Sequence, residues 1–500
     1  MTLENARQAL MDLQKTMTAY HHAIGLLFFD GATAAPRGTA ENRSRTTSVL
    51  SQALYELTTR PDTVALLEEL DSRRGELTDR EKRTVELLIK GVRKMQRIPL
   101  DEFVAFRRLG MEANAVWREA KERSDFDAFA PYLQKRFEMS RRIAGYVAPE
   151  MDPYDYWLDD NEEGVDRRMC DAFFRTVRQH TVPLLHRVQE KPQLPNDAIR
   201  GHFPTPPQER LAHRLMDILQ LDRNHVGLST TEHPFTTSLG THLDERITTH
   251  YFAEDFSYSM FSVIHEGGHA LYNTGSDDSL AGTVLDGGVS MCVHESQSRF
   301  YENYLGRSHA FCEYLFPILR DIFPDHLRSY TAEDFYRAVN RAEPTLIRTQ
   351  ADELTYCLHI MVRYELEKRA MAGELAVADM PAEWNRLYKE YLGIDVPDDR
   401  RGILQDCHWA DGYLGYFPSY ALGNAYGAQF LRKMKETVDV DGCLRCGDLG
   451  PINAWNREHI WRHGHLYRPA ELFTNATGES FDPTVYTDYL EQKFTALYDL

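Results

Sequence analysis

The chain has 500 residues, of which 42% are hydrophobic and 27% are charged, and its formal net charge is −19 at pH 7. Because a nucleic-acid-binding surface needs clustered Lys and Arg, this acidic composition argues against a nucleic-acid partner. No apolar run approaches the roughly 18 residues that span a bilayer, and residues 1–10 lack the features of a signal peptide. We therefore expect a cytoplasmic protein without a membrane segment, in which seven scattered cysteines are reduced thiols.

Periodic apolar residues predict a mainly α-helical fold. At the amino terminus they recur at three- and four-residue steps, as Leu3, Ala6, Leu10, Leu13, Met17, Tyr20, Ile24 and Leu27. A second stripe, in residues 85–95, follows Thr78 and Glu81, which predict a helix-capping box. Farther along, Thr331 is expected to begin a helix that Pro344 ends.

The chain contains no linker rich in Pro, Gly or Ser. We therefore expect residues 1–500 to form one domain, a large helical body with a deep cleft. Residues from about 230 to 430 should form its catalytic core, and the amino-terminal helices should form a wall or lid of the cleft. Strand signals are sparse, but residues 246–252 are predicted to pair with a neighbour near residues 235–239 in a small sheet.

The most informative segment is His-Glu-Gly-Gly-His, residues 265–269, which lies in an apolar stretch expected to be helical. Positions i and i+4 of a helix share one face, so His265 and His269 can bind a single Zn²⁺ ion. Glu266 would then act as general base for a water that attacks a peptide carbonyl. The predicted sheet lies beside this helix, and its edge strand is expected to hold the substrate backbone.

A catalytic zinc ion keeps three protein ligands and leaves its fourth position to water, so one more ligand is required. Residues 288–305 are predicted to form a second helix, in which Glu295 is the preferred ligand and His294 and Glu302 remain alternatives. A zinc-finger spacing also occurs, in Cys443, Cys446, His459 and His463. The span between these pairs lacks the apolar residues of a finger core, so we do not expect a second zinc site there.

Six ordered motifs resemble those of the carboxypeptidase Taq family of metallocarboxypeptidases. They occupy residues 233–235, 244–248, 265–269, 294–297, 347–352 and 402–409. The likeness also touches residues 29–33, where Phe29 replaces the family's tryptophan, and residues 463–464 and 476–479, so it spans nearly the whole chain. This resemblance implies that Glu295 is the third metal ligand. It further implies a homodimer that accepts other divalent metals, such as Co²⁺ or Mn²⁺.

A carboxypeptidase must bind the terminal carboxylate of its substrate, which an arginine fork does best. Both Arg348 and Arg246 lie in matched motifs; we favour Arg348 for the carboxylate and expect Arg246 to close off the substrate channel. Arg348 is expected near the start of a helix that runs through Leu354 and Leu358. His233 is expected at the substrate edge or in the cleft wall.

The transition state also requires a donor for its developing oxyanion. His408 is a natural donor, and similarity to related helical zinc peptidases points to Tyr416, with Tyr420 as the alternative. We therefore expect a zinc-dependent metallocarboxypeptidase, with one divalent metal ion per chain, that releases single residues from peptides with a free C-terminal carboxylate. An oligopeptide metalloendopeptidase on a similar fold and a catalytically inactive metal-binding scaffold remain the alternatives.

Overall fold

The computed structural model describes residues 1–500, which divide into two compact units. Unit 1 comprises Met1–Met95, Asn196–Val339 and Phe430–Ser480. Unit 2 comprises Gln96–Pro195, Asn340–Gln429 and Phe481–Leu500. The expected single domain and its catalytic core stay predictions, because residues 230–430 contribute to both units.

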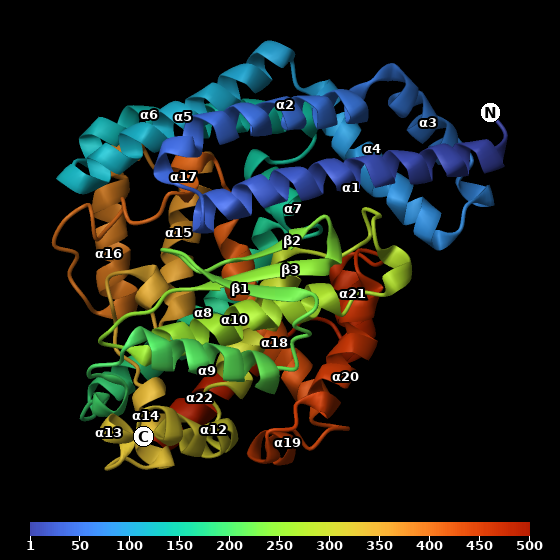
Figure 1. Cartoon of the computed structure of the whole chain (residues 1–500). Helices are drawn as coiled ribbons and strands as arrows, with labels where there is room; N and C mark the ends of the chain where they lie inside the picture. Colours follow the sequence, from blue (N-terminus) through green and yellow to red (C-terminus); the bar gives the residue numbers. More distant parts are fainter. The chain divides into compact units, whose positions relative to one another are not determined.

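Helices dominate both units, which confirms the predicted fold class (Figure 1). Those of unit 1 are α1 (Leu3–Thr33), α2 (Ala40–Thr59), α3 (Pro61–Ser72), α4 (Asp79–Arg97), α9 (Thr205–Ile218), α10 (Phe256–Thr274), α11 (Met291–Arg299), α12 (His309–Ile322), α13 (Pro324–Leu327), α14 (Ala332–Val339), α19 (Val440–Cys446), α20 (Gly450–His459) and α21 (Pro469–Thr477). Those of unit 2 are α5 (Leu100–Arg123), α6 (Phe126–Val147), α7 (Pro153–Asn161), α8 (Arg167–Gln189), α15 (Tyr356–Met371), α16 (Met380–Leu392), α17 (His408–Asp411), α18 (Phe417–Met434) and α22 (Thr484–Tyr498), with the last residues of α18 in unit 1. None of these helices is long and apolar enough to cross a bilayer.

The two predicted amino-terminal stripes meet in one hydrophobic cluster of unit 1. Ala6 and Leu10 of α1 pack there with leucines of α3 and with Val85 and Val92 of α4. The predicted capping box is also present: the Thr78 amide donates to Glu81 Oε2 at 2.7 Å, and the Glu81 amide donates to Thr78 Oγ1 at 3.3 Å. The apolar period and the cap therefore predict these helices correctly.

Two helix boundaries predicted around residue 340 are wrong. α14 ends at Val339, well before Pro344, and the Val339 carbonyl accepts a hydrogen bond from the Arg307 guanidinium instead of an amide of a further turn. Arg348 lies in a short 3₁₀ turn, and α15 begins only at Tyr356. Asp352 explains the delay, because its Oδ1 accepts the amides of Leu354 and Thr355 and so holds a turn before the helix.

A three-stranded sheet in unit 1 consists of β1 (Val226–Thr230), β2 (Thr236–Leu239) and β3 (Thr241–Thr249), in the order β1-β3-β2. The predicted pairing is confirmed: β2 runs antiparallel to β3, with Thr236 opposite Ile247. β1 pairs in parallel with β3 and was not predicted. α10 packs against β2 and β3, so the sheet does lie beside the helix that carries the histidine pair (Figure 1).

Candidate metal centre

The two glycines of the His-Glu-Gly-Gly-His segment allow α10 and its neighbours to approach closely. A Cβ on Gly268 would lie 2.8 Å from the Gln297 carbonyl oxygen and 2.8 Å from the Ser298 Cα, both in the backbone of α11. A Cβ on Gly267 would lie 2.6 Å from Leu219 Cδ1. Close packing therefore outweighs the roughly 1 kcal/mol of helix propensity that each glycine costs.

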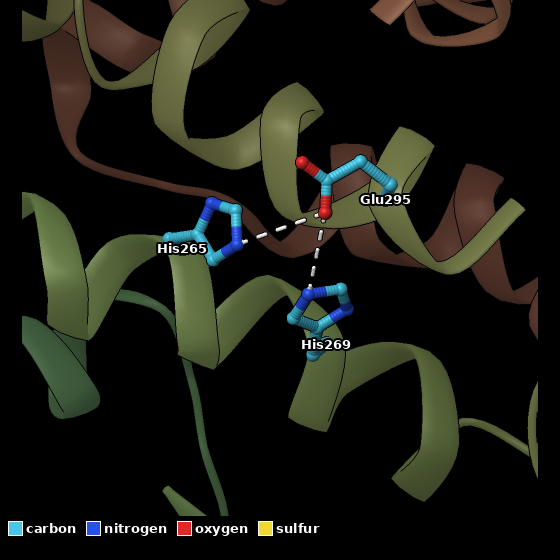
Figure 2. Close-up of side chains that lie close together, drawn as sticks. All are labelled: His265, His269 and Glu295. Atoms are coloured by element: carbon cyan, nitrogen blue, oxygen red, sulfur yellow. Dashed lines mark ion pairs between the residues drawn. The ribbon is translucent and has the colours of Figure 1, made fainter. Parts of the chain in front are cut away.

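This packing brings two imidazoles of α10 and one carboxylate of α11 to a common point (Figure 2). Glu295 Oε2 lies 3.8 Å from His265 Nε2 and 3.7 Å from His269 Nε2, and the candidate ligand atoms all lie within 4.8 Å of one another. Ligand atoms on a tetrahedral zinc ion lie about 3.4 Å apart, given bonds of about 2.0–2.2 Å. The chemistry and the spacing of these donors therefore fit a divalent metal ion.

Glu302 and His294, the alternative ligands of the sequence prediction, contact the two histidines at their Nδ1 atoms. Glu302, in the π-helical segment Phe300–Leu305 that continues α11, accepts a hydrogen bond from His265 Nδ1 at 2.8 Å. His294 Nδ1 lies 3.3 Å from His269 Nδ1. Both contacts occupy the Nδ1 atoms, which leaves each Nε2 atom facing Glu295.

Arg299 fixes the carboxylates of this centre. Its Nε donates to Glu295 Oε1 at 2.7 Å, and its Nη1 donates to Glu302 Oε2 at 3.0 Å. Burial alone would raise the pKa of Glu302, but Arg299, His265 and Arg307 outweigh it and hold that pKa well below its ordinary value. Glu302 is therefore an anion that stabilises a proton on His265 Nδ1.

Glu266 is also buried and is held by the sheet. Thr236, the first residue of β2, donates its hydroxyl to Glu266 Oε2 at 2.6 Å. Burial raises the pKa of Glu266 above its ordinary value. β2 is the edge strand of the sheet and packs against α1, so the predicted general base lies beside the strand at the sheet edge.

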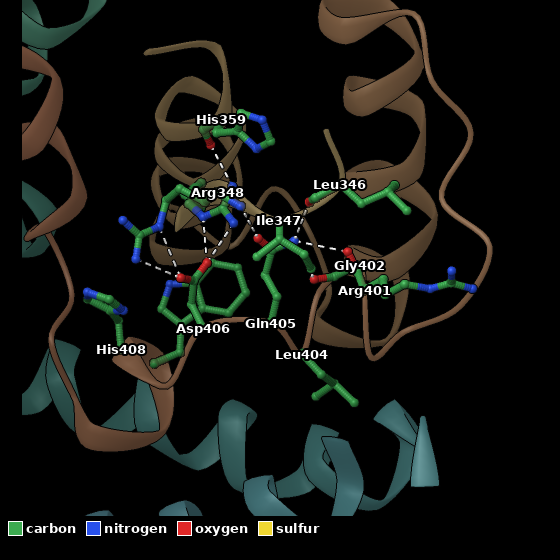
Figure 3. Close-up of polar contacts among 12 residues, drawn as sticks. Leu346, Ile347, Arg348, His359, Arg401, Gly402, Leu404, Gln405, Asp406 and His408 are labelled. Atoms are coloured by element: carbon green, nitrogen blue, oxygen red, sulfur yellow. Dashed lines mark hydrogen bonds and ion pairs between the residues drawn. The ribbon is translucent and has the colours of Figure 1, made fainter. Parts of the chain in front are cut away.

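Unit 2 contains the predicted carboxylate-binding arginine, which is not free (Figure 3). Arg348 Nη2 donates to Asp406 Oδ1 at 2.9 Å, and Arg363 Nε donates to Asp406 Oδ2 at 2.7 Å. Asp352, four residues after Arg348, makes no ion pair with it and instead caps the turn before α15. Two guanidinium groups share one carboxylate, so Asp406 alone does not balance both positive charges.

His408, Tyr416 and Tyr420 lie together in unit 2. His408 Nε2 is 3.3 Å from the Tyr420 hydroxyl, and the His408 and Tyr416 rings are 5.8 Å apart between centroids. Burial lowers the pKa of His408 to about 4, so its imidazole is neutral at pH 7. A neutral imidazole and two phenols are suitable hydrogen-bond donors to a developing oxyanion.

The other predicted substrate-binding residues lie in unit 1. Arg246 is on β3 and pairs with Asp244 at 2.7 Å, with about a third of its side chain exposed. His233 lies exposed in the bend before β2. The cysteines and histidines with zinc-finger spacing do not form a metal-binding group of the kind seen at Glu295.

Thr236, Arg299 and Arg363 were missed by the sequence analysis. Arg299 stands four residues after Glu295 on a predicted helix, a spacing that already indicates an ion pair. Thr236 and Arg363 carried no such signal, because their partners are distant in sequence.

A His-Glu-x-x-His helix with a glutamate from the next helix as third candidate ligand is typical of zinc metallopeptidases. Residues 9–494 match the family described as carboxypeptidase Taq (M32) metallopeptidase. The chain is 37% identical over 500 residues to Carboxypeptidase 1 of Bacillus subtilis, with 100% of both chains covered. It is 36% identical over 513 residues to Thermostable carboxypeptidase 1 of Thermus thermophilus, again with 100% of both covered.

Solved structures agree with these relatives. The M32 carboxypeptidase from Deinococcus radiodurans R1 is similar with a TM-score of 0.96 and 35% identity, over 99% of this chain and 100% of that one. Metallocarboxypeptidase 1 of Trypanosoma cruzi is similar with a TM-score of 0.93 and 32% identity, over 98% and 99% of the two chains. The chain therefore belongs to the carboxypeptidase Taq (M32) family and is a metal-dependent carboxypeptidase that acts on peptides.

Proposed function

We propose that His265, His269 and Glu295 hold one divalent metal ion, Zn²⁺ in the simplest case, and that the enzyme releases single C-terminal residues. The observation that carries the proposal is the convergence of these two imidazoles and one carboxylate. Two nitrogens and one oxygen are the usual protein donors of a catalytic zinc site, and they leave a position for water. A bound divalent cation supplies Lewis acidity toward a carbonyl oxygen and acidifies water.

Glu266 is proposed as the general base that takes a proton from the attacking water and delivers it to the leaving amine. Its burial favours the proton-bearing form, and the Thr236 hydroxyl orients one carboxylate oxygen. The edge of β2 is proposed to align the substrate backbone, with His233 at its entrance. With these assignments, Glu266 on α10 carries out both proton transfers.

Arg348 is proposed to bind the substrate carboxylate, with Arg246 as the alternative. The positive charge that Asp406 leaves uncompensated supports Arg348. His408, with Tyr416 or Tyr420, is proposed to donate to the oxyanion. Arg348→Lys and Arg246→Lys distinguish the arginines: the true carboxylate ligand should raise KM for a free peptide at least tenfold, because lysine cannot make the bidentate contact.

We further propose a cytoplasmic homodimer that also accepts Co²⁺ or Mn²⁺. The family resemblance supports the dimer and the metal tolerance. Seven cysteines without a disulfide support a reducing compartment.

Paired substrates test the proposed function. The metal-loaded enzyme should shorten a peptide with a free C terminus one residue at a time and should leave the same peptide untouched when its C terminus is amidated. Internal cleavage of the amidated peptide, detected by mass spectrometry, would establish the endopeptidase alternative. Glu266→Gln should bind metal but lose at least about a thousandfold in kcat; an unchanged kcat would exclude the general-base role.

A further inference from the structure

One face of α15 presents two buried ionisable side chains to the same segment of unit 2, residues 406–416. Arg363 and Glu367 stand one helical turn apart on α15, and both are fully buried. Arg363 donates to Asp406, at the start of the segment. Glu367 accepts from residues at its centre and near its end, so α15 holds the segment at several points.

Three neutral donors converge on the Glu367 carboxylate. The Trp409 indole Nε1 donates to Oε1 at 2.7 Å. The Gly415 amide and the Tyr154 hydroxyl donate to Oε2 at 3.0 and 2.8 Å. Gly415 is closely packed and only glycine fits there, because its φ is +71° and a Cβ would lie 2.7 Å from the Trp157 carbonyl carbon.

These anchors flank His408 in the chain; its ring lies 4.4 Å from the Phe417 ring between centroids but makes few hydrogen bonds. Its Nε2 has one long contact with the Tyr420 hydroxyl, and its buried Nδ1 has no hydrogen-bond partner. Asp406 and Trp409 lie on either side of it in the chain, and both are fixed by α15. The orientation of His408 therefore depends on its backbone neighbours more than on its own hydrogen bonds.

We propose that Glu367 is a positioning residue for hydrolysis: it fixes Trp409 and Gly415 so that His408 and Tyr416 keep the geometry that the transition state requires. The inference rests on the proposed function, since it presupposes that His408 and Tyr416 contact the reacting group. The Glu367 side chain is fully buried, and this burial raises its pKa to about 7 although the hydrogen bonds from Trp409, Gly415 and Tyr154 oppose the shift. No contact of Glu367 with substrate is required.

Glu367→Gln in the full-length, metal-loaded enzyme tests the proposal. Glutamine keeps the shape but replaces one acceptor oxygen with a donor, so at least one of the three hydrogen bonds is lost. We expect kcat to fall between about ten- and a hundredfold, with KM unchanged within about twofold. In protein carrying ¹⁵N-tryptophan, the indole N–H proton of Trp409, assigned with Trp409→Phe, should move upfield. An unchanged kcat with a shifted indole signal would overturn the proposal.

Glu353→Gln is the matched control. Glu353 is also a buried carboxylate of unit 2, but its partners are Tyr489 and Lys493, far from residues 406–416 in sequence. This variant should leave kcat and the Trp409 signal unchanged. An equal fall in kcat would show that any buried carboxylate of unit 2 has the same effect and would remove the positioning role.

A variant cycle separates this inference from the proposed function. If His408→Gln/Tyr416→Phe leaves kcat unchanged, the proposed oxyanion role fails, and with it the presupposition of the inference. If that pair lowers kcat, adding Glu367→Gln should change it by less than about twofold further. A full additional loss would show that Glu367 acts by another route. Should Glu367→Gln fail to fold, Trp409→Phe removes one donor from the same carboxylate and should lower kcat with unchanged KM.

Discussion

His265 and His269 differ in what touches their Nδ1 atoms. A carboxylate, Glu302, accepts from His265, whereas the imidazole of His294 faces His269. A carboxylate partner increases the basicity of a ligand histidine and fixes its tautomer, and a neutral imidazole does so less strongly. The two histidines should therefore contribute unequally to metal affinity.

Glu302→Gln tests this inequality. Glutamine can still accept a hydrogen bond from His265, but it removes the negative charge, so we expect metal affinity to fall by about ten- to a hundredfold. Competition titration with a chelator of known affinity measures the change. Glu313→Gln, which changes a half-exposed carboxylate on α12, should leave the affinity unaltered. Equal affinities for wild type and Glu302→Gln would contradict the prediction.

Glu245 should make the stability of the protein depend on pH. The side chain is fully buried on β3, its Oε2 accepts from Asn273 at 3.1 Å, and its Oε1 has no partner. Burial raises its pKa to about 8, whereas an unfolded glutamate titrates near pH 4.3. Between these values the folded protein binds more protons than the unfolded chain, so its unfolding free energy falls as pH rises.

Glu245→Gln removes this dependence. Relative to the variant, wild type should lose up to about 1.4 kcal/mol per pH unit between pH 5 and 8, and the loss should level off about one unit above the folded pKa of about 8. Urea unfolding of both proteins across this range measures the difference. Glu458→Gln, an exposed control on α20, should follow wild type. A constant difference between wild type and Glu245→Gln would show that the carboxyl group titrates normally.

At the residue scale, local spacing indicated the two candidate imidazole donors, and the family resemblance indicated Glu295, but neither indicated the residues that hold them in place. His265 and His269 lie four residues apart on one helix. Residues at this spacing share one helix face whatever the tertiary structure around them. The second elements that hold them, such as Thr236 on β2, lie far away in sequence. The contacts of these residues depend on tertiary packing, and no local spacing in the sequence indicates them.

At the element scale, α10 and α11 pack closely only because Gly268 has no side chain. The atoms nearest to a Cβ there belong to the backbone of α11, which cannot rotate away. Any added volume must therefore push the helices apart. Since His269 and Glu295 stand on opposite sides of this contact, separation also widens the metal centre.

Gly268→Ala should destabilise the protein by about 1–3 kcal/mol, although alanine is the better helix former. It should also weaken metal binding. Gly91→Ala is the control, because Gly91 lies exposed within α4 and nothing lies within 4 Å of a Cβ there. That variant should gain about 0.5–1 kcal/mol. Thermal unfolding measures the stability of both variants, and chelator competition measures their metal affinity. A stabilised Gly268→Ala would refute the close-packing explanation.

The missed strand β1 and the wrongly predicted boundaries of α14 and α15 all depend on contacts that an apolar pattern does not record. β1 contains Gly227 and lies parallel to β3, so neither alternation nor a short hairpin indicated it. α14 and α15 have boundaries set by side chains, Arg307 at the end of one and Asp352 before the other. Periodicity predicts where a helix exists, but hydrogen bonds to side chains outside the helix decide where it begins and ends.

At the scale of the whole molecule, the family motifs are divided between the units. Residues 233–297 belong to unit 1, and residues 347–409 belong to unit 2. The order of motifs along the chain identified the family, but it did not indicate this division. Each compact unit is formed by stretches that are far apart in the sequence. Unit 1, for example, includes residues 430–480, which follow a long stretch of unit 2.

All three proposed metal donors lie in unit 1, so removal of the metal should have a localised effect. An ion that binds only the folded state stabilises it by about 4 kcal/mol at a thousandfold excess over its Kd. The ion would link α10 to α11, so chelation should speed amide hydrogen exchange in those two helices first. α8 and α15, both in unit 2, should keep their exchange rates. Mass spectrometry of exchanged peptides measures this, and readdition of Zn²⁺ should restore protection. Equal acceleration in both units would mean that the metal stabilises the molecule as a whole, and no acceleration in α10 would mean that its histidines do not bind the ion.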